Sequence, residues 1–164
     1  MKRLPAFLAA ILMAAPAIAQ DDPFVTFKVL KPEIALRAAV AAMENCRAQG
    51  YQVGVSVVDR FGLPQVFIRD QLAGNNVPET AFRKAWTAVS FRQPTLALAD
   101  ATQPGTPASA IRDLSMPLAL GGGVPIESAG SVVGGIGVSG APQPEFDDAC
   151  ARAGIDAIED EIGF

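Results

Sequence analysis

The sequence predicts an α+β fold, a single domain in which helices flank an antiparallel sheet. Segments typical of helices and of strand pairs alternate along the chain in the order helix, hairpin, helix, hairpin, helix. The chain has 164 residues, half of them apolar, and neither a linker nor an internal repeat divides it. A chain of this length buries enough surface to form one core.

The first 19 residues have the features of a secretory signal peptide. Lys2 and Arg3 precede the apolar run 6–15, and residues 17–19 (Ala-Ile-Ala) supply a small-x-small cleavage pattern. We expect cleavage near Ala19 and a periplasmic or secreted protein. A retained membrane anchor is the alternative, but the run is shorter than the about 20 residues that span a bilayer. We therefore expect no stable membrane anchor.

Charge and composition exclude several classes of function. The chain carries 13 basic and 17 acidic residues, and two of the basic ones lie in the expected signal peptide. An acidic chain without Lys/Arg clusters is a poor nucleic-acid binder, because phosphate contacts dominate that affinity. The chain contains no His. This excludes Ser-His-Asp and Cys-His catalysis and any His-ligated zinc or haem within the chain.

The first half of the chain supplies one helix, one hairpin and a second helix. Residues 20–30 are expected to be a flexible segment before the folded domain, 31–164. A helix is predicted over 33–49, after Pro32 and before Gly50, with Leu36, Val40 and Met43 on its apolar face. Strands at 53–58 and 66–68 flank a turn-rich connection. The second helix begins at Pro78 and runs to about Arg92, and its predicted apolar stripe leaves out Arg83 and Lys84. The aromatic residues predicted to lie in the core are Phe61, Phe67, Phe82, Trp86 and Phe91.

The second half supplies a second hairpin and a last helix. A short helix is expected at 95–100 and a short apolar segment at 114–120. Strands are expected near 124–127 and over 132–139, where Gly134, Gly135 and Gly137 permit close approach by another backbone. The last helix is predicted over 144–162. The acidic residues expected on its solvated side are Asp147, Asp148, Glu159 and Asp160.

Cys46 and Cys150 are the two cysteines of the chain. In an oxidising compartment they most simply form one disulfide. Two free, buried thiols are the alternative.

Two glycine-rich or serine-containing patterns resemble catalytic or cofactor motifs. Residues 135–140 match G-x-G-x-x-G, but the chain lacks the following strand and acid that a dinucleotide site needs. Ser139 has no His to take its proton, so local hydrogen bonding is favoured over a Ser–Lys dyad with Lys84. Lys84 itself is either an anion-binding cation or part of a solvated helix face.

Several segments occur together in an order that is typical of one family. These are 55–62 (VSVVDRFG), 83–88 (RKAWTA), 91–95 (FRQPT), 121–126 (GGGVPI) and 133–141 (VGGIGVSGA). The chain resembles the GlcG/HbpS-type family of haem-binding-like proteins over roughly residues 31–162. The resemblance implies an α+β fold with an antiparallel sheet between helices, and homo-oligomers. Members of that family include haem binders, an extracellular redox-sensing partner of a sensor kinase, and a protein encoded with glycolate oxidation genes.

The resemblance implies a non-catalytic exported protein that binds haem or another small ligand. Some haem-binding relatives are thought to use a His ligand, which this chain cannot supply. Met116 is the predicted axial ligand, with Lys84 and Arg92 on the haem propionates. Met43, Tyr51, an oxygen ligand or a site shared between subunits are the alternatives. Two other functions stay open: an accessory protein or enzyme for small organic acids such as glycolate, with Lys84 and Arg92 as the carboxylate clamp, and a ligand-free oligomeric partner of a membrane sensor.

Overall fold

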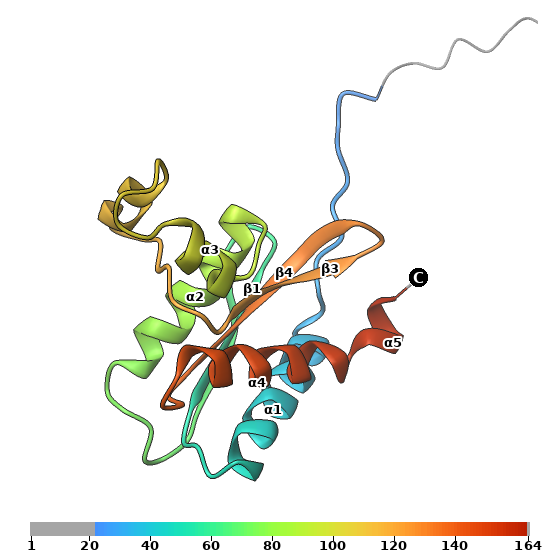
Figure 1. Cartoon of the computed structure of the whole chain (residues 1–164). Helices are drawn as coiled ribbons and strands as arrows, with labels where there is room; N and C mark the ends of the chain where they lie inside the picture. The colour runs from blue at the N-terminus through green and yellow to red at the C-terminus, as the bar shows by residue number, and fades with distance from the viewer. Residues whose placement is uncertain (1–21, 164) are drawn as a thin grey trace, which may run out of the picture.

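The computed structural model describes residues 22–163, so the expected signal peptide lies outside the described residues. Its centre is a four-stranded antiparallel sheet with the strand order β2-β1-β4-β3 (Figure 1). The strands are β1 (Gly54–Asp59), β2 (Pro64–Arg69), β3 (Gly123–Ser128) and β4 (Ser131–Ser139). Both predicted hairpins are therefore present, β1–β2 and β3–β4.

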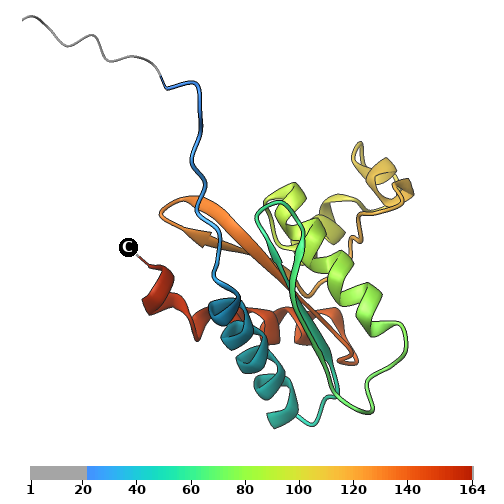
Figure 2. The same cartoon turned by 180° about the vertical axis from the view of Figure 1, so that it is seen from behind.

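Helices cover both faces of the sheet (Figures 1 and 2). α1 (Pro32–Ala48) and α4 (Pro144–Asp156) pack on one face, and α2 (Val77–Phe91) packs on the other, with α3 (Thr95–Ala101) following it. The main core lies between the sheet and the α1–α4 pair. The structure thus confirms the predicted α+β class, its antiparallel sheet and its flanking helices. No helix within residues 22–163 is long and apolar enough to cross a membrane.

α1 buries only one of the three residues predicted on its apolar face, Met43. Its small residues Ala35, Ala38, Ala39 and Ala42 are fully buried, and Met43 and Cys46 are buried beside them. Leu36 and Val40 are 45% and 39% exposed, so their assignment to the buried face was wrong. The alanine face allows α1 to lie close to α4 and to the sheet. A stripe of larger side chains would hold these elements apart.

The glycines of β4 bring α2 directly against the sheet. A Cβ added at Gly137 would overlap the backbone carbonyl of Ala81, and one added at Gly135 would lie 2.9 Å from the carbonyl oxygen of Ala85. Both carbonyls belong to α2. The expected close backbone approach is therefore confirmed, and the approaching backbone is that of a helix.

Substituting Gly137 by alanine is expected to lower the free energy of unfolding by about 3 kcal/mol, because the new methyl group meets backbone that cannot rotate away. Urea denaturation followed by circular dichroism measures the loss. Gly105→Ala is the control, since Gly105 has a φ of +89° and no heavy atom within 4 Å of an added Cβ. It should cost only about 1 kcal/mol of left-handed strain. Equal losses for the two variants would show that α2 does not rest on β4 in this way.

The aromatic side chains lie around the core and do not fill it. Phe61 is 58% exposed and Phe67 is also exposed, so the core prediction was wrong for both. Phe82, Trp86 and Phe91 are only partly buried. The narrow spacing between helix backbone and glycine-rich strand leaves room for Ala, Val and Ile but not for rings. The ring of Phe61 instead meets the ring of Phe27 edge-on, with centroids 5.6 Å apart.

One predicted helix is divided in the structure, and the apolar segment 114–120 is a loop. This loop follows a 3-10 turn at Ser109–Asp113. Arg83 of α2 holds this loop by donating to the carbonyl oxygens of Ser115, Met116 and Pro117, each at 3.1 Å. The last helix is divided into α4 and the short α5 (Glu159–Ile162). Ile158, in the break, is buried in the core.

The two edge strands differ in the backbone groups that they leave free. At the β3 edge, the Gly123 N–H donates to the Thr95 hydroxyl at 2.8 Å, and that hydroxyl donates to the Leu120 carbonyl oxygen at 2.7 Å. Pro125, next on the same edge, has no N–H. At the β2 edge, the register of β2 with β1 leaves the backbone N–H and C=O groups of Phe67 and Arg69 pointing away from β1.

Candidate functional site

A buried ion pair links α2 to α4 next to the end of β4. The Lys84 side chain is 1% exposed, and its Nζ donates to Asp147 Oδ2 at 2.7 Å and to the Val138 carbonyl oxygen at 3.0 Å. The solvated-face interpretation of Lys84 is therefore wrong. The predicted solvated position was also wrong for Asp147 and Asp148, since both are buried. The first turn of α4 faces the interior because β4 leads directly into it at the end of the sheet.

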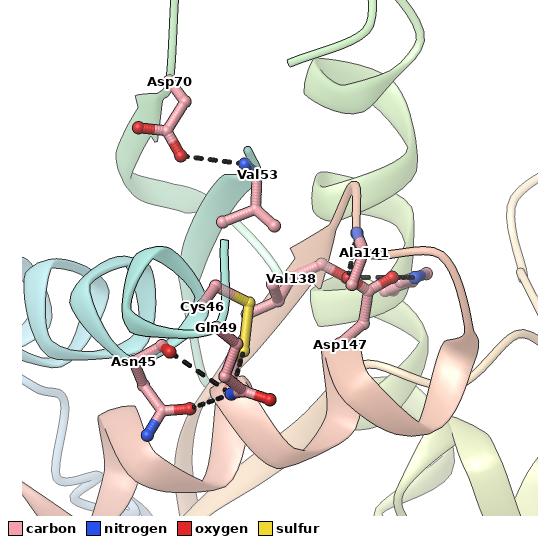
Figure 3. The surroundings of a disulfide bond; sticks show 10 residues. Asn45, Cys46, Gln49, Val53, Asp70, Val138, Ala141 and Asp147 are labelled. Carbon is pink, nitrogen blue, oxygen red and sulfur yellow. Dashed lines mark hydrogen bonds and ion pairs between the residues drawn. A yellow bond between two sulfur atoms is a disulfide. The ribbon is translucent and has the colours of Figure 1, made fainter. Parts of the chain in front are cut away.

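The second oxygen of Asp147 fixes the turn between β4 and α4. Asp147 Oδ1 accepts a hydrogen bond from the Ala141 N–H at 3.0 Å, and Figure 3 shows Asp147 between Ala141 and Val138. Gly122 completes the surroundings, because a Cβ there would lie 3.0 Å from Lys84 Nζ and 2.6 Å from the Val138 carbonyl oxygen. The pair therefore ties together α2, β4, α4 and the glycine run before β3.

Burial dominates the electrostatics of this pair. Desolvation lowers the pKa of Lys84, and the charge of Asp147 and their hydrogen bond partly offset this effect. Desolvation raises the pKa of Asp147, and Lys84 and the backbone N–H donors partly offset it. Each charge depends on the other for its compensation. In this arrangement the Lys84 ammonium faces protein partners and is not open to a ligand.

The neighbouring Asp148 is also buried. Its Oδ2 accepts from Arg152 Nε at 2.7 Å, and its Oδ1 has no partner among the described residues. Ser139 accepts a hydrogen bond from the Thr80 hydroxyl at 2.8 Å, which agrees with the local bonding expected of it. No hydrogen bond joins Ser139 to Lys84 in the described part of the chain.

The three predicted ligand-binding residues have separate surroundings. Lys84 faces the sheet, Met116 lies half-buried in the loop held by Arg83, and Arg92 is exposed where α2 ends, with a φ of 54°. Within residues 22–163 no hydrogen bond or ion pair joins any two of them. Their roles toward haem stay predictions.

The predicted disulfide is present. Cys46 of α1 is bonded to Cys150 of α4, across a sequence separation of 104 residues, and both residues are fully buried (Figure 3). Gln49 lies beside the bond and donates to Asn45 Oδ1 at 2.9 Å. The bond fastens together the two helices that cover the main core.

A groove between the two ends of the described chain was missed by the sequence interpretation. We call it the terminal groove; it has a volume of about 640 Å³ and is bordered by residues 27–31, by α5 and by the β3–β4 hairpin. Its apolar walls are Phe27, Val29, Leu30, Ile34, Val133 and Ile162. The signal in the sequence was the alternation of Phe27, Lys28 and Val29, in a segment expected to be only flexible.

The charges in the terminal groove are mainly positive. Lys28 and Lys31 line it and are exposed. Its one acidic residue, Glu161, is paired with Arg37. This combination of apolar walls and two cations suits an amphipathic anion.

A second groove of about 490 Å³ runs along β3 and has the opposite character. Glu127, Asp156 and Glu159 line it. Its one cation, Arg152, is already paired with Asp148. An anionic ligand is therefore favoured in the terminal groove and repelled from the groove along β3.

Comparisons with known proteins agree with this architecture. The model of the family described as "Haem degrading protein HbpS-like" matches residues 30–156. A crystal structure of a double mutant of HbpS from Streptomyces reticuli is 39% identical, with a TM-score of 0.79, over 89% of this chain and 98% of that one. The crystal structure of a PduOC:haem complex is 32% identical, with a TM-score of 0.74, over 79% of this chain and 95% of that one.

A longer curated relative contains the same unit. The corrinoid adenosyltransferase PduO of Salmonella typhimurium is 36% identical over an alignment of 123 residues that covers 72% of this chain. The chain spans about a third of that relative, 35% of its length. The family model and the two crystal structures each match most of the chain. The chain therefore belongs to the HbpS-like family, as its GlcG/HbpS-type motifs had indicated.

Proposed function

We propose that this protein binds haem outside the cytoplasm and that the terminal groove is the binding site. One observation carries the proposal: the groove combines apolar walls with two lysines, Lys28 and Lys31, at its border. Haem has a flat, apolar porphyrin ring that carries two propionates. Its ring would lie against the apolar walls while each ammonium meets a carboxylate. The volume of about 640 Å³ is in the usual range for small-molecule and cofactor sites.

Two further findings support the proposal. The related PduOC has been crystallised as a haem complex. The buried disulfide suits an oxidising compartment, which agrees with the signal-peptide pattern of residues 1–19. Within this proposal the protein is a binder and not an enzyme. Its assembly into homo-oligomers stays a prediction.

Titration of the purified protein with haemin tests the proposal. We expect saturable binding at micromolar haemin with a shift of the Soret band. Reversing both groove charges (Lys28→Glu with Lys31→Glu) should weaken binding about tenfold or more, because two ion pairs of up to about 1 kcal/mol each are lost and the new carboxylates repel the propionates.

Arg92→Glu is the matched control for this experiment. Arg92 is an exposed cation outside the terminal groove, and it was the propionate partner predicted from the sequence. The variant should bind haemin as the natural protein does. A loss in Arg92→Glu with none in the double lysine variant would move the site to the end of α2, and no saturable binding at all would reject haem binding.

A further inference from the structure

The described residues offer haem iron no free nitrogen or sulfur ligand in the terminal groove. The chain has no His. Its two cysteines are joined in a fully buried disulfide. Met43 is buried in the main core, and the other methionine in the described residues, Met116, is on the loop that Arg83 holds. Neither methionine lines the terminal groove.

The remaining side-chain ligand atoms of the groove are oxygens with protein partners. The Ser128 hydroxyl is directed at the Ile162 carbonyl oxygen, to which it donates at 2.7 Å, and it would be a neutral and weak ligand; Glu161 is paired with Arg37. The Lys28 and Lys31 side chains are cationic donors without a lone pair for a metal. Tyr51, the one tyrosine, lies outside the groove with its ring stacked on Phe146 at 5.5 Å between centroids. The residues of the groove therefore fit the porphyrin ring and its propionates, but they do not fit the iron.

We infer that the terminal groove recognises the tetrapyrrole ring and its carboxylates and does not recognise the metal. This inference rests on the proposed function, because it concerns the same groove. The apolar walls and the two ammonium groups meet the same surface in haem and in metal-free porphyrin. The ligand class is therefore a planar tetrapyrrole dicarboxylate, and iron adds no selectivity to it.

Parallel titrations with haemin and protoporphyrin IX test this inference. Each ligand is titrated into the purified protein by absorbance, with free ligand measured by equilibrium dialysis. We expect dissociation constants that agree within about threefold, a difference below 1 kcal/mol. The double variant Lys28→Glu with Lys31→Glu should bind both ligands more weakly, by the same factor. Protoporphyrin IX dimethyl ester, in which both carboxylates are masked, should bind the natural protein more weakly than the free acid, and by a smaller factor than the charge reversal causes.

The possible failures are distinguishable. If haemin binds and protoporphyrin IX binds more than about threefold more weakly, the inference is overturned while the proposed function stands. If neither ligand binds, the proposed function fails and this inference fails with it. Met116→Leu and Tyr51→Phe provide a second check, since each removes a ligand atom without changing the groove. If either variant binds haemin more weakly but binds protoporphyrin IX as the natural protein does, the replaced residue is an iron ligand and the inference is overturned.

Discussion

Replacing Asp147 by asparagine is expected to lower the free energy of unfolding by about 3–5 kcal/mol. The substitution keeps the shape of the side chain and an oxygen that can accept from the Ala141 N–H, but it removes the negative charge. The Lys84 ammonium, 1% exposed, would then keep only neutral hydrogen-bond partners, and Asp148 would be the remaining buried charge that acts on it. An uncompensated charge in the interior is among the most destabilising single changes. Urea denaturation followed by circular dichroism measures the loss.

Two further variants distinguish the effect of an uncompensated Lys84 charge from a general loss of stability at α4. The double variant Lys84→Met with Asp147→Asn removes both charges, and it should recover most of the lost stability. Glu79→Ala breaks the exposed pair between Glu79 and Arg83 on the same helix, α2. It should cost less than about 1 kcal/mol, because exposed ion pairs contribute little. If Asp147→Asn is as mild as Glu79→Ala, the buried pair does not stabilise the fold as we argue.

Removing the disulfide is the second change with a large expected effect. Replacing Cys46 and Cys150 together by alanine should lower the free energy of unfolding by about 2–5 kcal/mol. The bond joins residues 104 apart, so it restricts the unfolded chain over a long loop. The chain-entropy account gives about 4.7 kcal/mol for a loop of about 100 residues, which sets the upper end of the range. Urea denaturation of the oxidised protein and of the double variant measures the difference.

Reductant and thiol labelling provide the control for the disulfide prediction. The oxidised protein should lose stability when it is unfolded in dithiothreitol, whereas the double alanine variant should not respond. Because the two sulfur atoms are bonded to each other, alkylating reagents should label neither cysteine in the native protein. Mass spectrometry without reduction should show a mass lower than that of the dithiol by two hydrogen atoms. Labelling of both thiols in the native protein would contradict the pairing.

The order of helices and strands could be predicted because its signals are local. A proline lies near the start of each of the helices α1, α2 and α4, and turn residues lie between β1 and β2. Each signal is therefore inside or next to the element that it delimits. The buried face of α1 could not be predicted in the same way. Leu36 and Val40 are more apolar than alanine, so periodicity alone selects them. The deciding quantity is the distance between α1 and α4, which no local pattern contains.

The candidate sites depend on contacts between distant parts of the sequence. Lys84 and Asp147 are 63 residues apart, and nothing in either segment shows that β4 brings them together. The terminal groove is formed by residues 27–31 and by α5, at opposite ends of the described chain. The cysteine pairing could be predicted because a chain with two cysteines has only one possible intramolecular pairing. Lysines offer no comparable restriction on their partners.

The difference between the two sheet edges limits how copies of this chain can assemble. Thr95 occupies the Gly123 N–H, and Pro125 has none to offer, so two successive outward positions of β3 give a foreign strand no N–H donor. At the β2 edge, the outward backbone groups of Phe67 and Arg69 both point away from β1. Strand pairing between copies is therefore favoured at β2 over β3, and a pair joined through β2 would be symmetric.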